Sequence, residues 1–169
     1  MPGSFGHLAT RFFDYLRAAR LSEAERQTVM SLLTEEESRI FFEQSQKDQA
    51  HGFDAALVIL DSGQSTAGRL RAALLHDVGK RNARLGLLGR VAASIFIKLG
   101  LPLTKRFKLY RDHGLVGAAD LEAAGSPSLV VEFARAHHSS RPSVLSEEDW
   151  ALLQSADVPA NARLARRRR

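Results

Sequence analysis

The amino-acid composition limits what kind of protein this chain can be. Of its 169 residues, 44% are hydrophobic and 25% are charged, and it has only 12 glycines and five prolines. These values are typical of one globular domain with its own hydrophobic core. Cysteine is absent, which excludes disulfides and thiolate metal sites and leaves histidine and carboxylate side chains as the strong metal ligands.

The positive charge of the chain is concentrated at its C-terminus. The sequence pI is about 10.1, but four of the 24 basic residues form the run Arg166–Arg169, so 20 basic residues face 19 acidic ones elsewhere. This balance gives no strong case for a nucleic-acid partner, and we expect residues 164–169 to be a solvated basic tail. Because no signal-peptide pattern begins the sequence, we expect a cytoplasmic location.

Helical patterns recur along the chain. Apolar residues are spaced by three and four positions and no segment alternates as a strand would, so the sequence predicts a compact all-α fold. An apolar stripe predicts a first helix over about residues 8–20. Two capping boxes, Ser22 with Glu25 and Thr34 with Glu37, predict helices that begin near residues 23 and 35.

Two further helices are expected in the middle of the chain. The segment from about residue 70 to residue 75 is apolar all round, as in a central buried helix, and Gly79 is a natural C-terminal cap for it. A helix over about residues 46–60 precedes it, with His51 beside an apolar face made of Ala50, Phe53, Leu57 and Leu60.

Three more helices are predicted, and the last two of them end at ionisable residues. A helix over about residues 114–124 stops at Gly125, and Pro127 suits the first position of the next helix. That helix ends at His137 and His138. A final helix, capped by Ser146, ends at Asp157.

Residues 85–103 form an apolar stretch with two interpretations. Arg90 and Lys98 interrupt it and Gly100 and Pro102 end it, so it does not qualify as a membrane span of about 20 apolar residues. A packed helix is the main expectation. A basic amphipathic helix that makes peripheral contact with a membrane surface is the alternative.

Five of the six histidines lie at or near helix ends or beside an apolar helical face, and only His7 looks incidental. A single histidine in a helix is usually a surface residue or a hydrogen-bonded core residue. The adjacent His76 and Asp77 differ, because they end an apolar helix and must be satisfied where they are buried. A divalent cation would do so.

The motifs together resemble a known family. The segments AALLHDVGK (residues 72–80), DQAHGFDAA, RDHGLVGA, RAHHSS and SADVPA resemble the HD-domain superfamily of metal-dependent phosphohydrolases. Their order is His, His-Asp, His, His-His and Asp, which is similar to the two-metal members of that superfamily. The resemblance covers residues 35–163, which we expect to be the HD domain, with residues 1–34 as a helical extension packed on it.

The resemblance implies a binuclear metal centre. One metal would be held by His51, His76, Asp77 and Asp157, and Asp77 would bridge to a second metal held by His113, His137 and His138. The cofactors would be one or two divalent metal ions, and the sequence does not distinguish Fe, Mn, Zn, Ni and Mg.

The same resemblance implies hydrolysis of a phosphate ester by a hydroxide that bridges two metal ions. The expected catalytic residues are Asp77, Lys80 and His113, and the expected substrate-binding residues are Lys80, Arg111 and Arg141. Lys80 is equally well explained as a cation that favours a helix C-terminus. The substrate would be a small phosphate-containing molecule such as a nucleotide.

Two departures from related families narrow the expectation. Ser139, Ser140 and Arg141 follow the paired histidines where the cyclic-dinucleotide phosphodiesterases of the superfamily carry Gly-Tyr-Pro. Cleavage of cyclic diguanylate is therefore not expected. Lys47 stands where some of those enzymes carry a glutamate for a third metal, so we expect at most two metal ions. A di-iron oxygenase and a non-catalytic metal-binding signalling module are the alternative functions.

Overall fold

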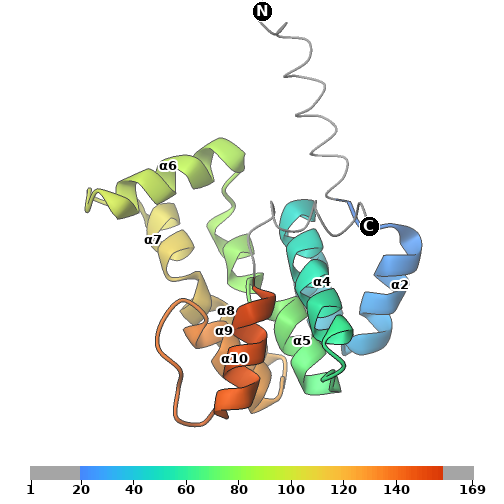
Figure 1. The fold of residues 1–169 in the computed structure, drawn as a ribbon. Helices are drawn as coiled ribbons and strands as arrows, with labels where there is room; N and C mark the ends of the chain where they lie inside the picture. Colours follow the sequence, from blue (N-terminus) through green and yellow to red (C-terminus); the bar gives the residue numbers. More distant parts are fainter. Residues whose placement is uncertain (1–19, 158–169) are drawn as a thin grey trace, which may run out of the picture.

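The computed structural model of the protein describes residues 20–157, which form nine α-helices, one 3-10 helix and no strand (Figure 1). The all-α prediction is confirmed for this part of the chain. Most of the first predicted helix, His7 and the basic tail lie outside the described residues. The helices are α2 (Glu23–Leu32), α3 (Glu35–Phe42), α4 (Gln46–Asp61), α5 (Ala67–Leu75), the 3-10 helix η1 (Val78–Ala83), α6 (Leu87–Lys98), α7 (Lys105–Arg111), α8 (His113–Ala123), α9 (Ser128–Ala136) and α10 (Glu147–Ala156).

Hydroxyl side chains fix the starts of most helices. Both predicted capping boxes are present: the backbone N–H of Ser22 donates to Glu25 at 2.7 Å, and that of Thr34 donates to Glu37 at 3.0 Å. Each hydroxyl in turn accepts from the glutamate's own N–H, so two unpaired donors are satisfied at each start. A single hydroxyl cap begins four further helices, α4, α5, α7 and α10, at Ser45, Thr66, Thr104 and Ser146.

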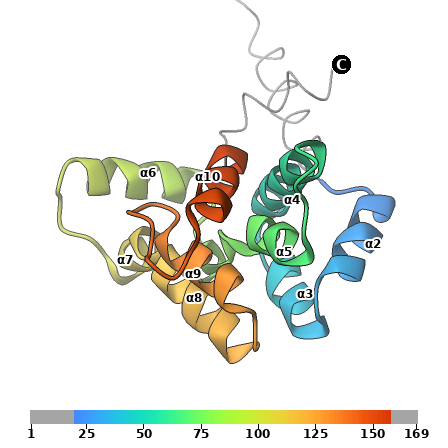
Figure 2. The same cartoon turned by 60° about the horizontal axis from the view of Figure 1, so that its bottom comes forward.

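Helix α5 is the centre of the core, as its apolar sequence predicts. It contacts α2, α3, α4, α9 and α10, and Figure 2 shows it between α4 and α9. Leu74 and Leu75 are fully buried in the same hydrophobic cluster as Phe133 of α9 and Val29 of α2. The central position of α5 matters for function, because its C-terminal end leads directly into His76 and Asp77.

The buried face of α4 differs from the predicted one. Leu57 and Leu60 are 36% and 43% exposed, so their assignment to the apolar face is wrong. Ala50 and Phe53 are buried as predicted, and Ile59 is buried in addition. Helices α4 and α5 approach closely at Gly52, where a Cβ would lie 2.5 Å from the carbonyl oxygen of Leu74.

The predicted boundaries around α8 and α9 are close to the observed ones. Gly125 follows α8 with a φ of 70°, the left-handed conformation that favours glycine after a helix. Pro127 is the residue before α9 and not its first helical residue, so that prediction is wrong by one position.

Helix α6 is the largest difference from the sequence prediction. The predicted helix is present and packs against α7. Of its twelve residues only Ala93 is buried, so most of its large apolar side chains are more exposed than a packed helix predicts. The part of the chain described here contains no helix that is long and apolar enough to cross a membrane. The alternative sequence interpretation, a basic amphipathic surface helix, is compatible with this exposure.

Gly79 does not cap α5 as predicted, because η1 begins at Val78 and includes it. A Cβ on Gly79 would lie 1.9 Å from the carbonyl oxygen of His113 and 2.6 Å from the amide nitrogen of Gly117. Only glycine permits this contact between η1 and α8, since backbone atoms on the facing helix cannot rotate away. The residue therefore sets the distance between Asp77 and His113.

The substitution Gly79→Ala should lower the free energy of unfolding by at least about 2 kcal/mol, because η1 and α8 must separate. Gly86→Ala is the matched control, since a Cβ there meets nothing within 4 Å and the backbone φ is −71°. Chemical denaturation monitored by circular dichroism measures both variants. Equal stabilities would contradict the packing role of Gly79.

A buried carboxylate connects the N-terminal helices to the core. Glu37 of α3 is 0% exposed and accepts hydrogen bonds from Arg71 at 2.6 Å and from Ser126 at 2.7 Å. Burial raises the pKa of the Glu37 carboxyl, but the hydrogen bonds from Arg71, Ser126 and the Thr34 backbone outweigh it and hold the pKa below its ordinary value. The charged form of Glu37 therefore stabilises the folded state.

We expect Glu37→Gln to destabilise the protein by about 2 kcal/mol at pH 7, because Arg71 loses a charged acceptor. The stabilisation by Glu37 is complete above the ordinary carboxyl pKa and is lost as the pH falls through the lowered folded-state pKa. The difference between wild type and variant should therefore shrink below about pH 4. Urea denaturation across this pH range measures it, with Glu36→Gln, an exposed neighbour on the same helix, as the control that changes little.

Candidate metal centre

The seven residues predicted as metal ligands lie together in one cluster. They come from five places in the sequence and sit mostly at helix ends: inside α4, after α5, at the start of α8, after α9 and after α10. Four of the histidines approach Asp77 or Asp157 at ion-pair distances, and the ring of His138 packs on that of His137 with centroids 4.0 Å apart. The members are His51, His76, Asp77, His113, His137, His138 and Asp157.

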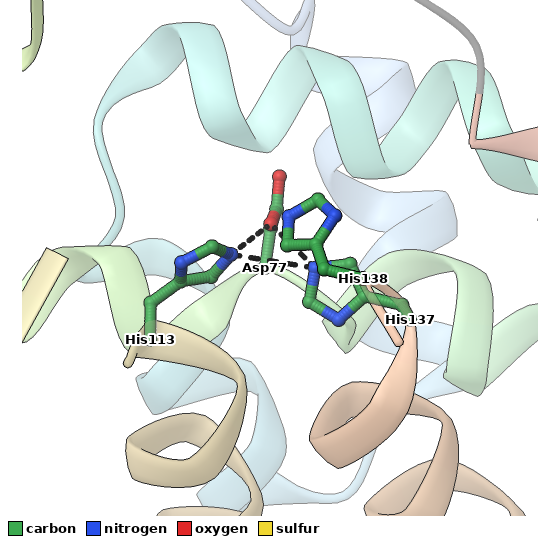
Figure 3. Close-up of side chains that lie close together, drawn as sticks. All are labelled: Asp77, His113, His137 and His138. Atoms are coloured by element: carbon green, nitrogen blue, oxygen red, sulfur yellow. Dashed lines mark hydrogen bonds and ion pairs between the residues drawn. The ribbon is translucent and has the colours of Figure 1, made fainter. Parts of the chain in front are cut away.

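Asp77 divides this cluster into two halves. Its Oδ2 lies 3.5 Å from Nε2 of His51 and 3.5 Å from Nε2 of His76. Its Oδ1 lies 3.2 Å from Nε2 of His113 and 3.4 Å from Nε2 of His137. Figure 3 shows the second half, in which the imidazoles of α8 and of the end of α9 converge on the carboxylate. One buried carboxylate thus faces two separate pairs of imidazoles.

Three of the histidines are oriented by the same type of hydrogen bond to the backbone. In each, Nδ1 lies 2.8 to 2.9 Å from the backbone carbonyl oxygen three residues earlier, in the last turn of the preceding helix. A carbonyl oxygen only accepts hydrogen bonds, so Nδ1 carries the proton and Nε2 presents its lone pair. Last-turn carbonyls have no partner within their own helix, which makes them available for this bond. The pairs are His76 with Ala73, His113 with Tyr110, and His137 with Ala134.

In each half of the cluster, two Nε2 atoms face each other at a short distance. Nε2 of His76 lies 3.2 Å from Nε2 of His51, and Nε2 of His113 lies 3.3 Å from Nε2 of His137. His113 and His137 both carry the proton on Nδ1, so their two Nε2 lone pairs face each other and repel unless a proton or a cation lies near both. A metal ion satisfies them while the backbone carbonyl keeps the other ring nitrogen, which is the usual second-shell arrangement of histidine ligands.

Asp157 completes the first half of the cluster. Its Oδ1 lies 2.9 Å from Nε2 of His51 and 3.4 Å from Nε2 of His76. It follows α10 directly, and one turn earlier Gln154 donates a hydrogen bond of 2.8 Å to the carbonyl oxygen of His137. Helix α10 therefore supplies one acidic group to the first half and fixes the backbone that carries the second half.

The electrostatics keep the carboxylates ionised. Burial raises the pKa of Asp77, but the positive charges of His76 and Lys80 and the adjacent rings of His113 and His137 outweigh it and hold the pKa well below its ordinary value. Lys80 also forms an ion pair with Asp77 Oδ2. Burial lowers the pKa of Lys80, yet the charge of Asp77 reverses this and raises the pKa above its ordinary value, so the ammonium stays charged.

The imidazoles differ from one another in their preferred charge. Burial opposes the protonation of His76, but the charge of Asp77 outweighs it and raises the pKa. Burial lowers the pKa of His137. Burial, together with the neighbouring His137 and His113, lowers the pKa of His138 to about 4. Neutral imidazole is the form that binds metal ions, and His137 and His138 favour it at neutral pH.

The residues present fit a metal ion. Two buried atoms of the cluster have no hydrogen-bond partner, Oδ1 of Asp77 and Nδ1 of His51. A cation beside Asp77 Oδ1 would satisfy the first. Two groups have ligand atoms that all lie within 4.8 Å of one another, and both contain Asp77. The groups are His51, His76 and Asp77, and Asp77, His113, His137 and His138.

Of the three predicted substrate-binding residues, only Lys80 is shown in contact with the cluster. Lys80 lies within the cluster through its ion pair with Asp77. Arg111 is half-exposed and pairs with its neighbour Asp112 at 2.8 Å. Arg141 donates to the carbonyl oxygen of Leu145 at 2.5 Å. Both arginines are engaged by other groups, and their role toward a substrate stays a prediction.

Sequence reasoning did not identify several residues that shape the site. Gln154 and Gly79 are two of them. A third is Asp48, which lies one turn before His51. The Asp48 carboxylate accepts two hydrogen bonds from Arg90 of α6, at 2.7 and 2.6 Å. The sequence predicted Gly79 as a helix cap and not as a packing contact. Asp48 and Gln154 each lie within one turn of a predicted ligand, and this proximity is the signal that could have identified them.

Searches against protein-family models, curated proteins and solved structures found no match to this chain. The structure is the remaining source of information on the site. It shows a cluster of mostly buried histidine and aspartate residues that could bind a metal ion and that is compatible with an HD-like site.

Metal content should depend on the shared carboxylate. Asp77→Asn should remove most bound metal from both halves, because Asp77 belongs to both groups, while His113→Ala should empty chiefly the second half and leave about half of the metal. Elemental analysis of the purified protein after loading with Mn²⁺, Fe²⁺ or Zn²⁺ measures this.

Asp149→Asn is the matched control, since Asp149 pairs with Arg69 away from the cluster. This variant should retain wild-type metal content. Full metal occupancy in Asp77→Asn would show that the cluster is not a shared metal site.

Proposed function

We propose that the protein is an HD-domain-like, metal-dependent phosphohydrolase that cleaves a phosphate ester of a small molecule such as a nucleotide. The observation that carries this proposal is the position of Asp77. Its two oxygens face two pairs of imidazoles, at 3.2 to 3.5 Å from the four Nε2 atoms. A carboxylate shared in this way suits two neighbouring cations, and two-cation sites are typical of phosphoryl-transfer enzymes.

The order of the ligands along the chain supports the family assignment. The sequence His, His-Asp, His, His-His and Asp, which resembles the two-metal HD proteins, corresponds to side chains that meet in space from five places in the sequence. A chance pattern of histidines would not be expected to converge in this way. The all-α core around α5 agrees with the same interpretation.

His51, His76 and Asp157 would hold a first metal ion, His113, His137 and His138 a second, and Asp77 would contact both. Such ions would act as Lewis acids toward a phosphoryl oxygen and would make a water molecule acidic enough to attack phosphorus at neutral pH. The backbone carbonyls behind the imidazoles fix the ligand geometry before substrate binds, so little reorganisation is needed during the reaction.

Lys80 supplies a fixed positive charge beside this centre. Its side chain is only 17% exposed and its ammonium is paired with Asp77. When two cations neutralise Asp77, that ion pair weakens and the ammonium becomes available to a phosphate oxygen of the substrate. Lys80 would then bind and orient an anionic substrate as a point charge.

The test is a substrate screen under argon with Mn²⁺-loaded protein. Nucleoside mono-, di- and polyphosphates, cyclic nucleotides and generic phosphodiesters should include at least one substrate that releases phosphate or nucleotide. Asp77→Asn should lower kcat/KM at least about 100-fold, since it removes the ligand shared by both halves. Asp149→Asn should retain activity.

Two other outcomes would replace the proposal. Iron-dependent consumption of O₂ without anaerobic hydrolysis would identify an oxygenase built on the same ligand set. Fully metal-loaded protein that is inert toward the whole panel and toward O₂ would identify a non-catalytic metal-binding module.

A further inference from the structure

Helix α6 carries a row of exposed apolar side chains. Leu88, Val91, Ile95 and Leu99 are 83%, 51%, 51% and 66% exposed. Their spacing of three, four and four residues places them on one side of the helix. We call these four residues the apolar stripe. So continuous a row of exposed large aliphatic side chains on a helix is characteristic of a binding surface.

The segment that carries the stripe contains basic residues and no acidic residue of its own. Residues 78–111 contain nine basic residues and no acidic residue. Four of these cations have no ion pair within the described part of the chain, whereas four others pair with acidic residues from elsewhere and Arg106 donates to the carbonyl oxygen of Ala83. The four unpaired cations are Arg84, Lys98, Lys105 and Lys108.

The orientation of α6 is fixed with the stripe outward. Arg90 holds the helix to α4 through its two hydrogen bonds with Asp48, and the ring of Phe96 packs on Phe107 of α7 with centroids 5.4 Å apart. Ala93, on the inner side, is fully buried. Figures 1 and 2 both show α6 at the edge of the molecule, away from α2 and α3.

We propose that α6 and the start of α7 form a docking surface for an anionic lipid membrane. The apolar stripe would enter the boundary between headgroups and acyl chains, and Lys98, Lys105 and Lys108 would lie at the level of the phosphates. The absence of any carboxylate between residues 78 and 111 removes the repulsion that an anionic surface would otherwise meet. The inference is independent of the metal centre and of the proposed hydrolysis.

Charge argues against two other occupants of the stripe. A second copy of the chain would bring two unpaired basic surfaces together, which is repulsive. Residues 1–19 carry one acidic residue, Asp14, and two basic ones, Arg11 and Arg17. That segment therefore offers no negative surface to the cations of α6 and α7.

A fluorescent label on the stripe tests the proposal directly. Because the chain has no cysteine, Leu88→Cys in the full chain gives a single labelling site for an environment-sensitive dye. Arg166–Arg169 are replaced by serine in every variant, so that the basic tail does not bind the vesicles by itself. Val144→Cys, at a site that is 62% exposed outside α6, is the matched control.

We expect the Leu88 label to shift to the blue with vesicles of phosphatidylcholine and phosphatidylglycerol, and not with phosphatidylcholine alone. The Val144 label should not shift. Replacing Lys98, Lys105 and Lys108 together by serine should weaken vesicle binding at least about tenfold. Val91→Ser with Ile95→Ser should do the same without changing charge, whereas Met30→Ser on α2 should have no effect.

Three results would overturn the proposal. The first is binding by the chain with the serine-substituted tail that is equal for neutral and anionic vesicles. The second is vesicle binding that is unchanged in the lysine and stripe variants. The third is a Leu88 label whose emission is already shifted to the blue without vesicles. If sedimentation velocity then shows a dimer, the stripe is covered by a second copy of the chain. If it shows a monomer, the stripe is covered by other residues of the same chain.

Discussion

The contact on which the rest of the structure depends is the burial of the Asp77 carboxylate among imidazoles. A carboxylate that is only 2% exposed is stable in the ionised form only if positive or hydrogen-donating groups surround it. Here Lys80 forms an ion pair with the carboxylate, and the Nε2 atoms of four histidine rings lie 3.2 to 3.5 Å from its oxygens, where a proton or a cation would be held. Because the rings come from different helices, holding them near one carboxylate constrains how α4, α5, α8 and α9 pack.

The histidine rings are held near Asp77 by hydrogen bonds at the ends of helices. A histidine placed just after a helix can donate Nδ1–H to a last-turn carbonyl that would otherwise lack a partner, and it then points Nε2 outward. The cluster uses this bond three times, after α5, α7 and α9. The same bond therefore completes a helix end and orients a candidate ligand, which explains why the ligands gather where helices stop.

Glycines allow the helices to come close enough for this arrangement. Gly52 brings α4 onto α5, and Gly79 brings η1 onto α8. Helix α6 has the opposite character, since it is held by Arg90 and Phe96 and leaves its apolar side uncovered. The molecule thus combines a tightly packed core that holds the candidate metal ligands with a peripheral helix whose exposed surface the core does not use, and the two features can be tested separately.

The sequence by itself determined the helical class, the starts of α2, α3 and α10, and the set of residues that could bind metal. These depend on local spacing and on hydroxyl caps, which act within one turn. Only the tertiary structure decided that Asp77 faces two pairs of imidazoles, that Leu57 and Leu60 are exposed, that Gly79 is a contact and not a cap, and that α6 is uncovered. Each of these depends on how one helix is rotated against another, and periodicity within a single helix does not contain that information.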